Sequence, residues 1–216
     1  MMSQKNHEVN TIAFVNGFFL GFSLILAIGV QNSFVIRQGL AKNHVILTVA
    51  FCAIADIFLI ITGISGIGLI TKKFFNAFHE WIFLVAGLWL GYYAVSHINN
   101  VFKSFKKDIQ EFTPEKLGIK QTLLKLFVFT FVNPHVYLDT LVLIGIISLQ
   151  YKGIDVWNFG LGASFASVIF FSALGFGASA MSSFFKSKTA WRILDSIIAF
   201  IMIFMSLKLI YQSGII

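Results

Sequence analysis

An amide, a proline, an imidazole, a phenol and a carboxylate occur close together in one stretch, at Asn133, Pro134, His135, Tyr137 and Asp139. They interrupt an apolar run, residues 126–151, that is long enough to cross a bilayer. Proline removes a backbone donor and clashes with the preceding turn, so we predict a broken helix here. Such a break survives in a membrane only where neighbours or a water-filled cavity satisfy the freed backbone groups. A carboxylate at that depth costs at least ~2.5 kcal/mol and indicates a functional site.

The spacing of two of these residues raises the question of catalysis. His135 lies four residues before Asp139, and therefore on the same helical face if a helix resumes after the proline. Such a pair could act as base and orienting carboxylate in acyl transfer. The sequence shows neither a partner nucleophile nor a phosphate-binding loop, and it lacks the setting of an intramembrane protease. We therefore assign no catalytic residue and interpret His135 as a structural donor or proton partner.

A second carboxylate, Asp56, stands in the middle of the apolar residues 50–59. No lysine or arginine of an apolar run lies at a similar depth, so Asp56 has no evident permanent counter-ion. A carboxylate so placed either stays protonated or receives a transient cation. A protonated aspartate that only bonds a neighbouring helix would show the same pattern. We favour a binding or proton-coupling role, because intramembrane carboxylates so often lie on transport pathways.

Glycine followed by two amides interrupts the first apolar run, at Gly29, Gln31 and Asn32. Glycine can bend a helix, and amides offer both donors and acceptors. This combination suits the amino and carboxylate groups of a small zwitterion. Hydrogen bonding between helices explains the same residue types equally well.

The composition places the chain in a membrane. Of its 216 residues 57% are hydrophobic and 12% are charged, and the mean hydropathy is +0.85. One globular core of this size could not bury so much apolar surface, so the surplus must face lipid. The single cysteine, Cys52, excludes a disulfide framework, and the histidines lack zinc-ligand spacing, so we expect no metal or cofactor. The net charge of +7 lies in loops between apolar runs, which indicates membrane orientation and not nucleic-acid binding.

Six apolar runs reach or approach the ~20 residues that a helical span needs. We predict an all-α integral membrane protein with six transmembrane helices, of which the first and fourth are broken. The runs are residues 9–36, 43–71, 81–102, 126–151, 156–185 and 193–207.

The basic residues predict the orientation of these spans. Of the 16 lysines and arginines, eleven fall on one side and five on the other. The positive-inside rule therefore places both termini in the periplasm and the loop 103–121 in the cytoplasm. This loop joins two halves, approximately residues 1–102 and 122–216, of one transmembrane transporter domain.

Weak internal similarity suggests that the halves are repeats. Residues 55–57 (Ala-Asp-Ile) can be aligned with residues 166–168 (Ala-Ser-Val). Three spans per half give the halves opposite orientations, which is the inverted-repeat arrangement of many transporters. Small-xxx-small patterns at residues 17–21 and 87–91 could serve a homodimer, but close packing within one bundle is their more usual role.

Several of these segments resemble the LysE-type basic amino-acid exporters, a family that includes the bacterial lysine and arginine exporters. Residues 21–32, with Arg-Gln-Gly at 37–39, resemble the first span of the family. Residues 52–56 are similar to its second-span motif, and residues 133–139 to its most distinctive signature. Residues 191–195 also match, so the resemblance covers essentially the whole chain.

The resemblance implies a bacterial inner-membrane exporter of L-lysine or L-arginine that is driven by the proton gradient or the membrane potential. Asp56 and Asp139 would hold the cationic side chain or a coupling proton, with His135 as a further proton-coupling residue. The remaining substrate-binding candidates are Gln31, Asn32, Asn133 and Tyr137.

Two positions depart from the family pattern. Val30 stands where a small residue or proline is usual, so a break in the first span must rest on Gly29. Asp195 stands where asparagine is common, and its neighbour Arg192 suggests an interfacial ion pair. Three alternatives stay open: export of another small solute such as a neutral amino acid or a metal ion, an intramembrane enzyme, and a non-transporting membrane scaffold.

Overall fold

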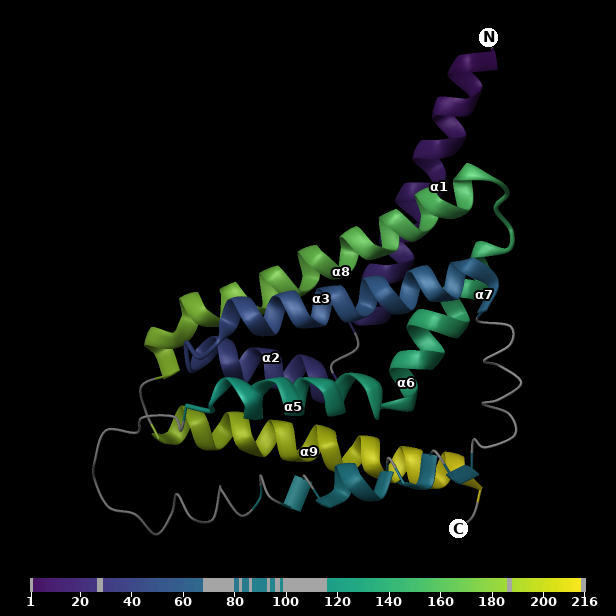
Figure 1. Ribbon diagram of the computed structural model, residues 1–216. Coiled ribbons are helices and arrows are strands. Elements are labelled where there is room, and N and C mark those ends of the chain that lie inside the picture. Colours follow the sequence, from purple (N-terminus) through teal and green to yellow (C-terminus); the bar gives the residue numbers. More distant parts are fainter. Residues whose placement is uncertain are drawn as a thin grey trace. The chain divides into compact units, whose positions relative to one another are not determined.

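The fold is described from a computed structural model, drawn in Figure 1. The described residues are 2–26, 29–67, 80, 81, 83–85, 87–92, 94, 95, 98, 116–185 and 188–214. Much of the predicted third span, residues 81–102, and most of the predicted loop 103–121 therefore lie outside the described residues. The chain forms two compact units, and each unit is described by itself.

The described part of the chain is helical and contains no strand, which confirms the predicted all-α class. Two segments are π-helices, named η1 and η2, and one is a 3₁₀-helix, named η3. The elements are α1 Met2–Ile25, α2 Val30–Leu40, α3 Val45–Thr62, η1 Gly63–Ile67, α5 Ile119–Phe131, α6 Pro134–Val136, η2 Tyr137–Leu143, α7 Ile144–Ser148, α8 Ile154–Ala180, η3 Met181–Phe185 and α9 Lys188–Ser213.

Three helices of the described part are long and apolar enough to cross a membrane: Val45–Gly66, Ile154–Ser183 and Thr189–Tyr211. They correspond to the second, fifth and sixth predicted spans. Thr11–Ile25 and Val30–Leu40 would add a fourth if this bent pair is one broken span. The described residues thus support a multi-pass membrane protein, and the count of six spans stays a prediction.

Both expected helix breaks are present. Helix α1 ends at Ile25, and α2 begins at Val30 after an extended Gly29 with φ −114° and ψ −173°. Helix α5 ends at Phe131, and Pro134 takes the first position of α6, where its missing N–H costs no helical bond. The apolar run was predicted to begin at residue 126, but helix α5 already begins at residue 119. Lys120 and Lys125 precede the apolar run, and yet lysine is a good helix former, so the helix extends through them.

The two breaks coincide with boundaries between the compact units. Unit 1 comprises Met1–Ala27, Val49–Ala77 and Asn133–Ala173, and unit 2 comprises Ile28–Thr48, Phe78–Val132 and Leu174–Ile216. The first break therefore divides α1 from α2, and the second divides α5 from α6, between the units. Each broken helix gives one part to unit 1 and the other part to unit 2.

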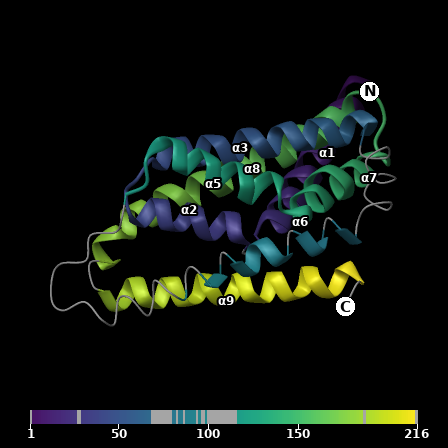
Figure 2. The same cartoon turned by 60° about the horizontal axis from the view of Figure 1, so that its bottom comes forward.

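In unit 1, α1 and α8 cross closely because glycines face the backbone of the partner helix (Figures 1 and 2). A Cβ on Gly21 would lie 2.9 Å from Ala163 Cα, and a Cβ on Gly162 would overlap the carbonyl of Phe14. The pattern at residues 17–21 therefore serves packing within the chain, as its sequence suggested. The buried core beside this crossing consists of Ala13, Ile60, Ile64, Ile144, Phe159 and Ala163.

Replacing Gly162 by alanine should destabilise the protein, because the added Cβ would meet backbone and not a flexible side chain. Overpacking of this kind typically costs ~1–3 kcal/mol. Gly177 on the same helix is a matched control, since a Cβ there meets no atom within 4 Å. Thermal unfolding in detergent should show a lower midpoint for Gly162→Ala but not for Gly177→Ala. Equal midpoints would show that α1 and α8 pack less closely than described.

In unit 2, α2 packs against α5 and α9. The ring centroid of Phe34 lies 5.3 Å from that of Phe129, and the ring of Trp89 contacts Phe129 at 5.6 Å. Asn43 Nδ2 donates a hydrogen bond of 3.0 Å to the carbonyl of Leu117. Because Asn43 follows α2 and Leu117 precedes α5, the two contacts set the helices antiparallel, as the views of Figures 1 and 2 show.

The second small-residue pattern, residues 87–91, faces α9 in unit 2. The hydroxyl of Ser206 donates a hydrogen bond of 2.7 Å to the carbonyl of Gly87. A Cβ on Gly91 would lie 3.0 Å from the same hydroxyl oxygen. This pattern therefore also serves contacts between helices of one chain.

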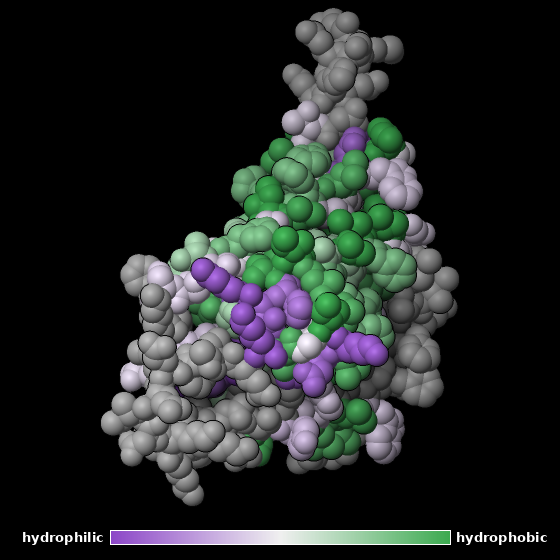
Figure 3. Space-filling model, turned by 60° about the vertical axis from the view of Figure 1, so that its left-hand side comes forward, coloured by the Kyte–Doolittle hydropathy of each residue, from purple (hydrophilic) through white to green (hydrophobic). Residues whose placement is uncertain are grey.

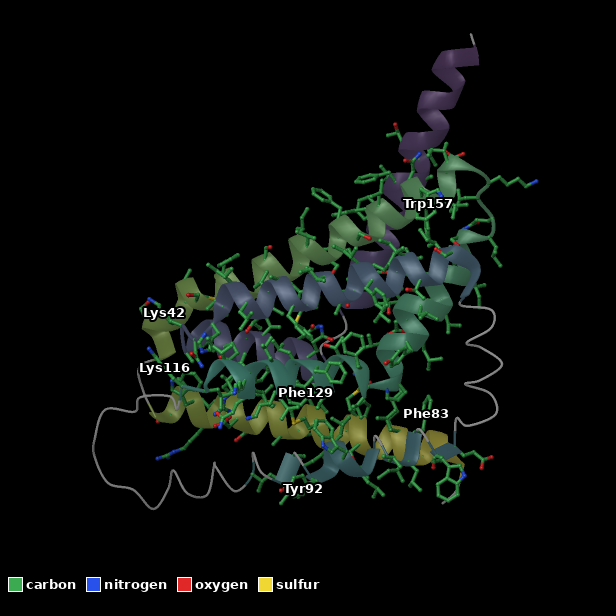
Figure 4. All side chains as sticks on the ribbon, viewed as in Figure 1. Lys42, Phe83, Tyr92, Lys116, Phe129 and Trp157 are labelled. Carbon is green, nitrogen blue, oxygen red and sulfur yellow. The ribbon has the colours of Figure 1, made fainter. Side chains whose placement is uncertain are left out.

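One end of unit 2 is basic. Lys42, Lys116 and Lys120 are exposed there, beside the Asn43–Leu117 contact that joins α2 to α5. Figure 4 shows Lys42 and Lys116 at the same end, and Figure 3 shows hydrophilic residues gathered on the face seen from that end. These lysines all belong to the side that the charge count assigned to the cytoplasm.

The outer faces of the long helices carry large apolar side chains. Ile54 and Phe58 on α3, and Phe200 and Phe204 on α9, are each at least 60% exposed. Exposed aromatic and aliphatic side chains in such number are unfavourable in water but suit a hydrocarbon environment. These residues are part of the apolar surplus that the composition assigned to lipid.

Candidate functional site

Asp56 is buried in unit 1, where α3 meets α8. Asp56 is only 3% exposed, and its Oδ2 accepts a hydrogen bond of 2.8 Å from the hydroxyl of Ser167. Among the described residues no lysine or arginine forms an ion pair with it. The carboxylate is therefore held by a neutral donor, which leaves its charge uncompensated whenever it is ionised.

Small side chains flank both partners of this hydrogen bond in the sequence. Cys52 and Ala55 on α3 and Ala163 and Ala166 on α8 are all buried. The comparison of the two halves in sequence had aligned Ser167 with Asp56 as equivalent repeat positions, and it gave the serine no role. The structure brings these two residues into direct contact.

The second break places the signature stretch at the start of an irregular helix in unit 1. The backbone carbonyl of Asn133 accepts a bond of 3.2 Å from the N–H of Val136, which closes the first turn after the break. Asp139 lies in the π-helix η2, and its carbonyl accepts a bond from the N–H of Ile144, five residues later. π-Helical turns are wider than α-helical turns and occur frequently at functional sites.

The side chains of this stretch are partly buried. Asn133, Tyr137 and Asp139 are all half-buried, and each takes part in further interactions. His135 belongs to α6, but the predicted role of its side chain lies outside what the structure describes.

Asp56 and Asp139 belong to the same unit and are connected through one close helix contact. A Cβ on Gly63 would lie 2.5 Å from the carbonyl of Leu141, and one on Gly145 would lie 2.8 Å from the carbonyl of Gly63. Asp56 precedes Gly63 by two turns, or ~10 Å along the helix axis, on the same face. The face of α3 that carries Asp56 thus continues into the contact with η2, which carries Asp139.

Gln31 and Asn32 lie in the first turn of α2 and belong to unit 2, whereas Asp56 and Asp139 belong to unit 1. Both residues are buried, at 6% and 7% exposure. The amide nitrogen of Gln31 has no hydrogen-bond partner among the described residues. The positive end of the α2 dipole lies at this turn, which favours a carboxylate or another anion there.

Asp195 also has a clear place in unit 2. Its carboxylate pairs with Nη1 of Arg37, on α2, and the guanidinium carbon lies 5.9 Å from the centre of the Trp191 ring. The sequence had suggested its neighbour Arg192 as partner. The structure instead shows a contact between two helices, which no local sequence pattern could have revealed.

The described residues contain no group of three or more histidine, cysteine, aspartate or glutamate side chains placed to hold a metal ion. Asp56 and Asp139 supply two carboxylates in unit 1, and Asp56 accepts its hydrogen bond from the neutral hydroxyl of Ser167. A carboxylate can bind a cation or exchange a proton.

The chain is similar to proteins described as amino-acid transporters and exporters. The chain matches the family model described as LysE type translocator over residues 22–213. A Mycobacterium bovis protein described as a candidate amino-acid transporter is 41% identical over 182 residues, which cover 84% of this chain and 88% of the relative. An arginine exporter of Serratia proteamaculans is 34% identical over 208 residues, covering 93% and 97%. A lysine exporter of Corynebacterium glutamicum is 29% identical over 227 residues, covering 91% and 97%. No solved structure matches the chain.

Proposed function

The chain belongs to the LysE-type translocator family, and we propose that it exports basic L-amino acids, lysine, arginine or both, across the bacterial inner membrane. The observation that carries this proposal is the buried carboxylate of Asp56, held by Ser167 and without an ion-pair partner among the described residues. A cationic substrate would supply the missing charge. The relatives named as lysine and arginine exporters support the same substrate class.

Each unit holds further candidate residues, and each set is considered by itself. Asp139 would supply a second contact to the cation or a second proton site, with His135 as its proton partner. Gln31, Asn32 and the N-terminal end of α2 would bind the substrate carboxylate, because amide donors and the positive end of a helix both favour an anion. Asn133 and Tyr137 offer polar groups at the second break, where they would bind the amino group.

Export of a cation requires an energy source. Moving one positive charge outward against a ~100 mV inside-negative potential costs ~2.3 kcal/mol. Each tenfold opposing concentration ratio adds ~1.4 kcal/mol. We propose that inward movement of protons supplies this energy, because Asp56 can exchange a proton for the substrate cation at one position.

Counterflow in proteoliposomes tests the proposal. Purified protein is reconstituted with unlabelled lysine or arginine inside, and uptake of the labelled amino acid is measured against a panel of neutral amino acids and metal ions as competitors. We expect lysine and arginine to exchange and to compete with each other. Exchange of neutral amino acids alone would show that the substrates are neutral and not basic. Turnover of a substrate in detergent, where no compartment exists, would indicate an enzyme.

We further propose six spans in two inverted halves, with both termini in the periplasm. The clustering of Lys42, Lys116 and Lys120 at one end of unit 2 supports one cytoplasmic side for these residues. A reporter that is active only outside the cytoplasm, fused after residue 216, should therefore be active. Activity of a reporter that works only in the cytoplasm would contradict the periplasmic placement of the C-terminus.

A further inference from the structure

Among the buried polar atoms of unit 2 that have no hydrogen-bond partner in the described residues, four lie on the neighbouring helices α2 and α5. They are Gln31 Nε2 and Gln38 Oε1 on α2, and Thr122 Oγ1 and Thr130 Oγ1 on α5. The two threonines are fully buried, and Gln38 is 3% exposed. Buried polar groups are nearly always paired in proteins, so four such atoms on two neighbouring helices call for an explanation.

The register of α2 and α5 places the four residues at two levels along these helices. The contacts Phe34–Phe129 and Asn43–Leu117 fix the antiparallel register of the helices. In this register Gln38 is level with Thr122, and Gln31 is level with Thr130. The two glutamines are seven residues apart and therefore share one face of α2, as Thr122 and Thr130, eight residues apart, share one face of α5. We call these four residues the polar seam.

Thr122 and Thr130 differ in their hydrogen bonding from two other helical hydroxyl residues, Thr62 and Ser65. Thr62 Oγ1 donates to the carbonyl of Phe58 at 2.7 Å, and Ser65 Oγ donates to that of Ile61 at 2.7 Å. This local bond to the preceding helical turn is available to any helical threonine. Thr122 and Thr130 do not make it, so their hydroxyls are left to bind another partner.

The two levels of the seam offer different hydrogen-bonding groups, a donor on Gln31 and an acceptor on Gln38. Gln31 Nε2 is a donor, lies in the first turn of α2 and so suits a carboxylate. Gln38 Oε1 is an acceptor and suits an ammonium group. The neighbouring charge of Arg37 is balanced by Asp195, which reduces its repulsion of a cation. Each threonine hydroxyl can serve either group as donor or acceptor.

We propose that the polar seam is a solute-binding site of unit 2, in which the carboxylate of the transported amino acid binds at Gln31 and Thr130 and its side-chain cation binds at Gln38 and Thr122. This assignment rests on the proposed export function and adds Gln38, Thr122 and Thr130 to the binding residues. It also gives the transported molecule a fixed direction along α2.

Valine substitution at both threonines separates a binding role from a structural one. Thr122→Val/Thr130→Val keeps the side-chain shape and removes two hydroxyls. Removing an unpartnered buried hydroxyl should leave stability unchanged or raise it, whereas removing a substrate contact should weaken binding. We expect an unchanged or higher melting midpoint in detergent, together with an increase of at least about tenfold in the counterflow KM. Thr62→Val, at a partnered hydroxyl outside the seam, should leave the KM unchanged.

The amino acid used is the one from the panel that the wild-type protein exchanges. If wild-type protein exchanges neutral amino acids but not lysine or arginine, the proposed substrate class fails and the seam is tested with the neutral solute. A KM equal to that of Thr62→Val overturns the seam as a binding site. A lower melting midpoint with an unchanged KM also overturns it, because the hydroxyls would then hold structural water.

Discussion

Replacing Asp56 by asparagine should nearly abolish export of lysine and arginine while leaving the fold intact. Asparagine keeps the size of the side chain and can still accept the hydroxyl of Ser167, so the change removes the charge alone. A buried carboxylate favours its protonated form until a cation arrives, and binding of the cation then releases the proton. Asparagine can neither bind the cation by charge nor exchange the proton. Loss of a charged partner should weaken substrate binding at least about tenfold.

Counterflow and proton-driven export measured over a range of pH values check this expectation. Any exchange that remains in Asp56→Asn should lose the pH dependence that protonation of Asp56 contributes. Ser167→Ala is the matched variant, since it keeps the carboxylate and removes its neutral donor. It should retain pH-dependent exchange. A normal rate and a normal pH profile in Asp56→Asn would show that the carboxylate is only a buried structural acid.

Breaking the ion pair between Arg37 and Asp195 should have the largest effect on stability. Arg37→Leu would leave the Asp195 carboxylate buried, at 8% side-chain exposure, without its cation. Removing one partner of a buried pair typically costs ~3–5 kcal/mol, and we expect the lower end because the Arg37 side chain is 23% exposed. The contact of the guanidinium with Trp191 is lost in the same variant.

A double-mutant cycle tests this expectation. Asp195→Leu alone should also lower the melting midpoint, because it leaves the guanidinium without its carboxylate. The double variant Arg37→Leu/Asp195→Leu should recover much of the loss, since two apolar side chains need no partner. Purely additive losses in the double variant would show that the two side chains do not act as a pair.

The positions of the helix breaks were predictable because single residues determine them. Proline at 134 cannot continue a helix that precedes it, and glycine at 29 gives no side-chain support to the turn between two apolar stretches. The burial of Asp56 was equally predictable, because uninterrupted apolar residues surround it in the sequence. These features depend on local chemistry, which the sequence states directly.

The partners of the charged residues were less predictable. The bond between Asp56 and Ser167 joins residues that are 111 positions apart, and the pair of Arg37 and Asp195 joins residues 158 positions apart. Such contacts depend on the register between packed helices, which hydropathy does not encode. The π-helical turn at residues 137–143 also escaped prediction, because its residue types suit an α-helix as well. The polar seam was missed because single threonines in an apolar helix carry no distinctive pattern.

The buried thiol of Cys52 gives the chain an internal probe of its own movements. It is fully buried, lies one helical turn before Asp56 on the same face, and is the only cysteine in the sequence. A membrane-permeable maleimide can reach it only when the packing around this face of α3 opens, so the rate of alkylation of the natural protein measures how often that opening occurs. Protection by a bound amino acid could then be followed without introducing any label site.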